Sequence, residues 1–318
     1  MSILVFVETD EGKIKKSSLE AVSYASAMND GDVVAIAFGE VDSAELSGVG
    51  KSGAQKVLHA ADQKLNEGNI QAYSTGIAAA MDSNGASSLV MANSSLGDAV
   101  AARVAIKTGA SLASNVTSLP DTSNGFKVTR SIYTGKAFAT VELTGDKRII
   151  AIKKNSVDIK EDGGDASVEN FAPEIPESDF GVKKLSQEKA TGDVLLPEAD
   201  IVVSGGRGMK GPENWNMIED LAKTLGAATG CSKPVSDIGW RPHHEHVGQT
   251  GVKVSPTLYV AVGISGAIQH LAGVNSSKYI VVINKDAEAP FFKAADYGIV
   301  GDAFEVLPKL TEALKSAN

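Results

Sequence analysis

The chain has 318 residues, of which 43% are hydrophobic and 22% charged, a composition typical of a globular protein of about two domains. Its formal net charge of −9, without a basic stripe, argues against nucleic acid as the main partner. The single cysteine, Cys231, excludes an internal disulfide and any cysteine-based zinc or iron–sulfur site.

Strands and helices alternate through the first 109 residues. Apolar runs predict strands over 3–7, 33–38, 54–58 and 88–92; helical periodicity predicts helices over 16–28, 61–65 and 97–109, and a short strand and a helix share 70–81. This alternation indicates a parallel sheet covered by helices on both faces. Because the sequence shows no targeting segment and no apolar run of membrane length, we expect a cytoplasmic protein that does not span a membrane.

The pattern changes after residue 115. Strands without intervening helices are predicted over 115–119, 126–133, 137–143 and 148–153, with a hairpin turn at Tyr133 to Lys136. These strands indicate an antiparallel β section. The polar, acidic segment 156–191 is interpreted as a connection with a strand or two, and we place the domain boundary between residues 192 and 193.

The remaining residues predict a second parallel unit. Strands are expected over 199–203, 226–230, 258–262, 279–283 and 297–301, and helices over 213–225, 291–295 and 306–315. The predicted fold is therefore α/β with two domains: residues 1–192, an α/β domain with an added antiparallel β section, and residues 193–318, a doubly wound parallel-sheet domain.

The stretch from Leu258 to His270 is the most informative part of the chain. A buried strand runs into a glycine-rich turn at Gly263 to Gly266, and residues 267–271 begin a helix. Glycines let backbone approach a ligand closely, and free N–H groups at a helix N-terminus attract anions. The stretch is interpreted either as an anion site or as a tight turn without a ligand.

Polar and glycine residues follow each predicted strand of this domain. They include Gly205 to Gly208 after the first strand, Ser265 and Gly266 after 258–262, Asn284 to Asp286 after 279–283, and Asp302 after the last. In an open parallel sheet, ligands bind at the carboxyl ends of the strands. These groups suit phosphates, with Asp302 available to a sugar or adenine, so a dinucleotide cofactor fits.

Each residue also has a structural alternative. Arg207 could pair with a surface carboxylate instead of a phosphate, and Asn284 and Asp286 could cap the following turn. His270 could be a core histidine, or a cationic or hydrogen-donating group that stabilises negative charge on a ligand.

The run His243, His244, Glu245 and His246 is interpreted as a solvated loop and not as a metal site, because adjacent loop residues rarely converge on one ion. Cys231 is interpreted as a packing residue. No catalytic triad is seen, so no catalytic residue is predicted. Since the histidine run is interpreted as a solvated loop, no metal ligand is predicted either. A rich ligand site without hydrolytic groups favours a cofactor that itself carries the chemistry.

Three longer motifs carry a resemblance to a known family. They are VGQTG at Val247 to Gly251, LYVAVGISGAIQHLAG at Leu258 to Gly273, and the segment Ile283 to Asp302; Gly205 to Gly208 with Glu213 and Asn214 also match. With these motifs the chain resembles the electron transfer flavoprotein alpha subunit. They cover most of the second domain, whereas the first domain matches in pattern and order.

The resemblance implies a heterodimer of alpha and beta subunits that holds one FAD, mainly in the alpha C-terminal domain, with AMP in the beta subunit. The N-terminal domain would contact the beta subunit. Electrons would arrive from acyl-CoA dehydrogenases of fatty acid β-oxidation and other flavoprotein dehydrogenases, and leave to a membrane quinone oxidoreductase or a similar acceptor. Such a protein is an electron carrier rather than a substrate-transforming enzyme.

The resemblance also implies which residues contact FAD. They are Arg207, Ser232, Lys233, Val247, Gly248, Gln249, Thr250, Ser265, Gly266, Ala267, Ile268, Gln269, His270, Asn284 and Asp302. Thr250 would bond near flavin N5, His270 would lie near flavin O2 and stabilise negative charge there, and the turn at Ser265 to Ala267 would hold the pyrophosphate.

One position departs from the family pattern. The family commonly has Ser-Arg where this chain has Ser232-Lys233, and that arginine lies against the flavin ring. Lysine keeps the charge but lacks the planar, stacking guanidinium. We expect FAD binding to be kept, and leave open the flavin potential and the stability of its one-electron-reduced form.

Other functions remain open from the sequence. The chain could belong to an electron-bifurcating system, in which the beta subunit holds a second FAD in place of AMP. An NAD-dependent oxidoreductase could use the same sheet edge, although His270 is its only candidate proton donor. A third alternative is a flavin-free nucleotide-binding or scaffold subunit.

Overall fold

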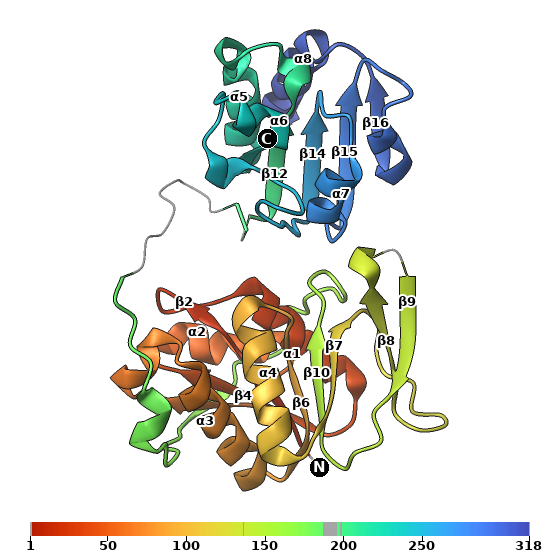
Figure 1. The fold of residues 1–318 in the computed structure, drawn as a ribbon. Coiled ribbons are helices and arrows are strands. Elements are labelled where there is room, and N and C mark those ends of the chain that lie inside the picture. Colours follow the sequence, from red (N-terminus) through yellow and green to blue (C-terminus); the bar gives the residue numbers. More distant parts are fainter. Residues whose placement is uncertain (1, 136, 187–195, 198, 318) are drawn as a thin grey trace. The chain divides into compact units, whose positions relative to one another are not determined.

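The computed structural model describes residues 2–135, 137–186, 196–197 and 199–317. The chain forms two compact units, residues 1–187 and 188–318, each with its own sheet (Figure 1). The boundary predicted between residues 192 and 193 lies outside the described residues. No helix in the described ranges is long and apolar enough to cross a membrane.

One sheet of nine strands runs through the described part of the N-terminal unit. In spatial order its strands are β11 (Ser167–Asn170), β5 (Lys56–Ala60), β4 (Asp32–Phe38), β1 (Ser2–Phe6), β6 (Ala86–Ala92), β10 (Arg148–Ile152), β7 (Ser111–Val116), β8 (Lys127–Ile132) and β9 (Ala137–Glu142). Along β1, Ile3 and Val5 enter one core cluster, whereas Leu4 and Phe6 enter another on the opposite face. A continuous apolar run is what a strand buried on both faces requires.

Helices cover both faces of this sheet, as the alternating pattern predicts. They are α1 (Lys16–Met28), α2 (Ser43–Gly48), α3 (Ile70–Ser83) and α4 (Ser95–Thr108), with short 3-10 turns η1 (Val49–Ser52), η2 (Gln63–Glu67), η3 (Tyr133–Gly135) and η4 (Glu177–Phe180) and a small hairpin of β2 (Thr9–Asp10) and β3 (Lys13–Ile14). Helix α1 packs into the first cluster, and α3 and α4 pack into the second. The Ser94 side chain accepts from Gly97 N–H and caps α4, as short polar side chains do at helix starts.

The antiparallel section is confirmed for only part of the predicted segment. Strands β7, β8 and β9 are antiparallel neighbours, and the β8–β9 pair runs from Lys127 opposite Glu142 to Ile132 opposite Ala137. Strand β10, however, lies parallel between β6 and β7, so the antiparallel prediction for residues 148–153 is wrong. Its residues Ile149 to Ile152 are all buried, which suits a central strand covered on both faces.

One smaller prediction is also wrong. No strand precedes α3 within 70–81, because the helix occupies that whole segment. The helix predicted over 61–65 is present as the short 3-10 helix η2, Gln63–Glu67. Lys136 of the predicted hairpin turn lies outside the described residues.

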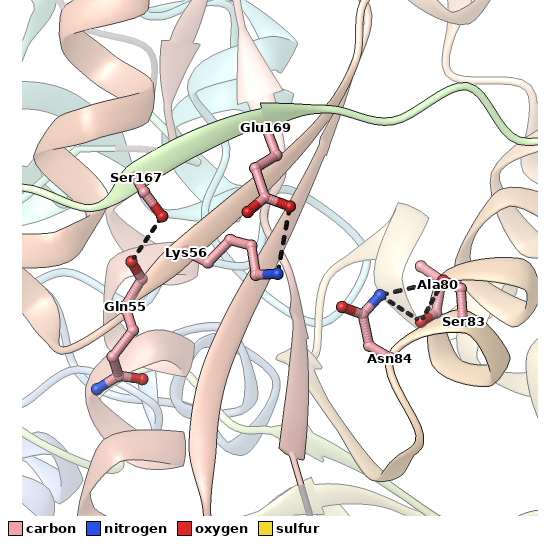
Figure 2. Close-up of polar contacts among 7 residues, drawn as sticks. All are labelled: Gln55, Lys56, Ala80, Ser83, Asn84, Ser167 and Glu169. Atoms are coloured by element: carbon pink, nitrogen blue, oxygen red, sulfur yellow. Dashed lines mark hydrogen bonds and ion pairs between the residues drawn. The ribbon is translucent and has the colours of Figure 1, made fainter.

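The connection after residue 156 returns to the sheet as the edge strand β11, parallel to β5 (Figure 2). Side chains add to this pairing: Ser167 Oγ donates to the Gln55 carbonyl at 3.3 Å, and Lys56 Nζ lies 3.2 Å from Glu169 Oε2. Figure 2 also shows Asn84, whose Nδ2 donates to the Ala80 carbonyl at 2.9 Å and closes the last turn of α3. The predicted strand within this connection is therefore present.

The C-terminal unit is a parallel sheet with helices on both faces, which confirms the doubly wound prediction. Its strands, in order, are β13 (Ala228–Cys231), β12 (Ile201–Gly205), β14 (Leu258–Val262), β15 (Tyr279–Asn284) and β16 (Tyr297–Val300). Helices α5 (Asn216–Leu225), α6 (Lys233–Asp237) and α8 (Ala303–Ala317) pack into the core on one face, and α7 (Ile268–Val274) into the core on the other. Short turns are η5 (Arg207–Met209), η6 (Pro212–Asn214), η7 (His243–Glu245) and η8 (Pro290–Ala294).

The order in which the chain adds strands to this sheet reverses at β12. After β12 the chain continues to β13 on one side, and it then crosses to β14 on the other side. The carboxyl ends of two strands whose connections diverge in this way leave a crevice, which is where ligands bind in open α/β sheets.

Two glycine turns meet at this crevice, backbone against backbone. Gly206 N–H donates to the Val262 carbonyl at 2.8 Å, and Gly208 N–H donates to the Gly263 carbonyl at 3.0 Å. Gly263 has a left-handed φ of +61°, and a Cβ there would lie 2.8 Å from Gly208 Cα. The close approach of the two turns therefore requires glycine.

We predict that Gly263→Ala destabilises the C-terminal unit more than Gly226→Ala does. Gly226 has a similar φ of +62°, but an added methyl group there meets open space. Both variants incur the left-handed backbone cost of about 1–2 kcal/mol, whereas only Gly263→Ala adds an overpacking cost of about 1–3 kcal/mol. Urea unfolding followed by tryptophan fluorescence measures this unit, because Trp215 and Trp240 are the chain's two tryptophans. Equal losses would contradict the prediction.

Candidate functional site

A cavity of ≈ 550 Å³ opens at the carboxyl ends of the C-terminal sheet. Among the residues predicted to bind a cofactor, those that line it are Arg207, Ser232, Lys233, Val247, Gln249, Thr250, Ser265, Ala267, Gln269, His270 and Asn284. They come from the ends of β12, β13, β14 and β15 and from the loop before β14. Residues separated by as many as 77 positions in the chain therefore surround one space.

The other predicted residues lie beside the cavity. Gly248 packs against Gly273 of α7, Gly266 packs against Phe291, and the Ile268 side chain is 64% exposed. Asp302 lines an adjoining hollow of ≈ 370 Å³ together with Lys210 and Lys285.

That hollow and the cavity share part of their walls, namely Arg207, Gly208, Gly263 and Asn284. Asp302 Oδ1 accepts from the Phe304 N–H at 3.0 Å, and Lys210 Nζ lies 3.6 Å from its Oδ2. The bond from Phe304, followed by the nearby lysines, lowers the pKa of Asp302. Asp302 is thus an ionised helix cap at the edge of this hollow.

The cavity has a charged rim and a buried floor. Arg207, Lys233, Thr250 and Ser265 are exposed at the rim, together with the carboxylates of Asp237 and Asp286. The floor includes the buried residues Ser232, His246, Val247 and His270. This arrangement suits a ligand that has a charged part near the surface and a largely neutral part inside.

The loop Val247 to Thr250 is held on both sides. Val247 N–H donates to the Cys231 carbonyl at the end of β13 at 2.9 Å, and Gln249 N–H donates to the Gln269 carbonyl of α7 at 2.7 Å. Ser232 follows β13 directly, and its N–H donates to the Gly205 carbonyl at 3.0 Å. Backbone hydrogen bonds therefore place the loop and Ser232 relative to β12 and α7.

Asn284 has a structural role as well as a place in the wall. Its Nδ2 donates to the Ile264 carbonyl at 3.0 Å, and its Oδ1 accepts from Asp286 N–H at 3.0 Å. Asp286 Oδ1 in turn accepts from Glu288 N–H. The turn-capping interpretation therefore holds for both residues, although both also line the cavity.

His270 is 6% exposed and is held by two aromatic residues. Its Nε2 lies 2.8 Å from the Tyr259 hydroxyl oxygen, and its ring packs on the edge of Phe291 with 5.6 Å between centroids. Nδ1 has no hydrogen-bonding partner within the described residues. Burial, followed by nearby His246, lowers the pKa of His270 to about 4. In this chain the ring is therefore neutral near pH 7, which favours the hydrogen-donating alternative over the cationic one.

His246 is the clearest residue that sequence reasoning missed. It is 2% exposed and lines the cavity, and burial, with lesser contributions from His243 and Lys233, lowers its pKa. The interpretation as a solvated loop is confirmed for His243 and His244, which are exposed, but is wrong for Glu245 and His246. The available signal was its position immediately before Val247 in the VGQTG run.

Glu245 is buried because it is paired. Arg241 Nη2 and Nε lie 2.6 and 2.8 Å from its two carboxylate oxygens, and the same guanidinium lies 3.0 Å from Glu219 and over the Trp215 ring. This bidentate pair holds the loop that presents His246. Neighbouring Cys231 is fully buried; burial and Glu245 raise the pKa of its thiol to about 12, so it is a protonated packing residue.

Comparison with known proteins gives a consistent result over both units. Residues 195–275 match the family model described as "Electron transfer flavoprotein FAD-binding domain", and residues 3–176 match "Electron transfer flavoprotein domain". An electron transfer flavoprotein subunit alpha from Syntrophomonas wolfei is 38% identical over 98% of this chain and 98% of its own length. The Bacillus subtilis protein of the same name is 36% identical over 99% and 98%, and a probable mitochondrial one from Caenorhabditis elegans is 37% identical over 98% and 93%.

The buried neutral state of His270 predicts a loss of stability in acid. Because its pKa falls from 6.5 to about 4 on folding, the unfolded chain binds a proton below pH 6.5 that the folded chain excludes. The stabilisation is complete above pH 6.5 and is lost as the pH falls through 4, by up to about 3 kcal/mol. The free energy of unfolding of His270→Gln should fall less over this range.

The measurement is urea unfolding at several pH values, again followed by tryptophan fluorescence. His244→Gln, which changes an exposed histidine in the same unit, should keep the acid sensitivity of the unaltered chain. The same pH slope for His270→Gln and the unaltered chain would rule out this role.

Proposed function

The chain belongs to the family of electron transfer flavoprotein alpha subunits, and from this premise we propose that it is the FAD-binding subunit of a heterodimer with a beta subunit. It accepts electrons from acyl-CoA and other flavoprotein dehydrogenases and passes them to a quinone oxidoreductase or a similar acceptor. It acts as an electron carrier. The N-terminal domain contacts the beta subunit, which holds AMP.

The observation that carries this proposal is the cavity in the C-terminal unit. It lies at the carboxyl ends of β12 and β14, where the order of strands in the sheet reverses, and it is lined by residues of the motifs that resemble this family. The segment 195–275, which matches the FAD-binding domain, includes the Arg207 turn, the Val247 to Thr250 loop and His270.

The residues present fit FAD. Gly208 and Gly263 form part of the wall that the cavity and the hollow share. Because neither residue has a side chain, a ligand can approach the main chain closely there. Arg207, which lines both spaces, would bind the pyrophosphate with the turn at Ser265 to Ala267. Asp302 would accept a hydrogen bond from a ribose or adenine group.

The flavin ring would occupy the part of the cavity with the buried floor. There the buried Nδ1 of His270, which has no partner within the described residues, would contact a polar group of the flavin ring. Thr250 and Ser232 would bond the ring edge, and Lys233 would place a positive charge beside it. When bound, FAD supplies the one- and two-electron chemistry. The protein's own groups orient the ring, exclude water from one side and stabilise negative charge on it.

The first test is coexpression of the full chain with an electron transfer flavoprotein beta subunit. We expect a yellow heterodimer with flavin absorbance, and extraction should release one FAD and one AMP. Two FAD molecules would instead favour the electron-bifurcating alternative. A folded but colourless heterodimer with no measurable affinity for FAD would refute the proposal.

The second prediction concerns Lys233, which is exposed at the cavity rim. Lys233→Arg should raise the flavin midpoint potential, because a planar guanidinium stacks on an aromatic ring and stabilises negative charge on it better than an ammonium does. The expected gain of about 0.5–1 kcal/mol equals about 20–40 mV for one electron. Spectroelectrochemical titration measures it.

Lys293→Arg is the matched control for this potential. Lys293 is exposed on η8 and lines neither the cavity nor the adjoining hollow, so its substitution should leave the potential unchanged. No change of potential in Lys233→Arg would place Lys233 away from the flavin ring, and a lower potential would contradict the expected stacking.

A further inference from the structure

We propose that Tyr259 is a positioning residue for His270: its hydroxyl donates to Nε2 and thereby places the imidazole hydrogen on Nδ1, where it is available to the ligand. The identity of that ligand as FAD rests on the proposed function. The hydrogen-bonded state of the two side chains does not, because both belong to this chain.

The geometry fixes both rings. Tyr259 lies in β14 and is fully buried, and its hydroxyl oxygen is 2.8 Å from His270 Nε2 in α7. Phe291 stacks on Tyr259 with 6.3 Å between centroids and meets the His270 ring edge-on at 5.6 Å. Because Phe291 packs against both rings, the tyrosine and the histidine are held in one relative orientation.

The direction of this hydrogen bond follows from the available protons. Burial raises the pKa of Tyr259, only partly offset by the nearby Ser204 hydroxyl, so the phenol keeps its hydrogen. Burial lowers the pKa of His270, so its ring carries one hydrogen near pH 7. Ser204 Oγ has no hydrogen-bonding partner within the described residues, so it does not accept the Tyr259 hydrogen. His270 Nε2, which lies 2.8 Å from the Tyr259 hydroxyl oxygen, is therefore the acceptor. The single imidazole hydrogen then resides on Nδ1.

This tautomer determines what the cavity floor offers. A hydrogen on Nδ1 makes the buried ring a donor to an acceptor atom of the ligand, whereas the other tautomer would present a lone pair there. A flavin carbonyl becomes a stronger acceptor as the ring gains electrons, so a neutral donor of fixed direction favours the reduced ring. Tyr259 would thus act on the flavin potential through His270, without being placed in contact with the ligand.

The direct test is an NMR measurement on the full chain labelled with ¹⁵N-histidine and assembled with unlabelled beta subunit. The chain has 5 histidines, so the long-range proton–nitrogen spectrum has few signals, and loss of one set in His270→Gln assigns them. We expect a protonated Nδ1 and a bare Nε2 in the unaltered chain. In Tyr259→Phe, the hydrogen should move wholly or partly to Nε2. A hydrogen on Nε2 in the unaltered chain, or no change in the variant, would overturn the proposal.

The second readout is FAD affinity and flavin potential. Loss of one hydrogen bond's orienting effect should weaken FAD binding by about 2- to 10-fold in Tyr259→Phe and make the potential more negative. Tyr24→Phe is the matched control: Tyr24 is also fully buried, but its hydroxyl donates to the Ser118 carbonyl at 2.8 Å in the N-terminal unit. It should leave both quantities unchanged.

The two proposals fail in different ways. If the heterodimer binds no FAD, the proposed function fails, but the tautomer of His270 is still measured in the flavin-free protein. If FAD binds and Tyr259→Phe matches the unaltered protein in affinity and potential, or if Tyr24→Phe changes them equally, the positioning role of Tyr259 is refuted. The tautomer of the unaltered chain is measured without any change at Tyr259, so a Tyr259→Phe chain that failed to fold would still leave that test decisive.

Discussion

The candidate site depends on one constraint, the direct backbone contact between the turns that follow β12 and β14. Gly208 and Gly263 meet without intervening side chains, and hydrogen bonds from Gly206 and Gly208 tie the two turns together. Because these turns form the wall between the cavity and the adjoining hollow, the position of Arg207 depends on the same contact. Side chains from other strand ends then complete a space that the glycines keep open.

The interior of that space is controlled by burial rather than by charge. His246 and His270 both have lowered pKa values because they are buried, so the floor is polar but neutral near pH 7. Positive charge is confined to the rim, at Arg207 and Lys233. A redox cofactor bound there would meet hydrogen-bond donors of fixed direction inside the cavity and solvent-screened cations at the rim. Because screening weakens charge interactions, the buried donors would act on the cofactor's negative charge more strongly than the rim cations.

Short motifs and apolar runs were enough to predict most of the fold and the cavity wall. Residues of the GISG run line the cavity because this run follows a parallel strand, and ligands bind at the carboxyl ends of such strands; residues of the VGQTG run join them from the loop before β14. Long-range pairing was not predictable: nothing local in Arg148 to Ile152 shows that it inserts between β6 and β7. The burial of His246 was missed because it depends on the Arg241–Glu245 pair and the packing of the loop, and Tyr259 had the pattern of an ordinary strand residue.

The place of β10 bears on how the chain acquires its structure during synthesis. Strand β10 lies between β6 and β7, which both precede it, so the first sheet has a vacant central position until residue 152 has been made. Strands β7 to β9 can form a hairpin assembly earlier, but they join the rest only through β10. The second sheet, in contrast, grows outward in chain order from β14 to β16. Late, non-local closure of this kind slows folding, so the first sheet has to form its central pairing across strands that are far apart in the sequence.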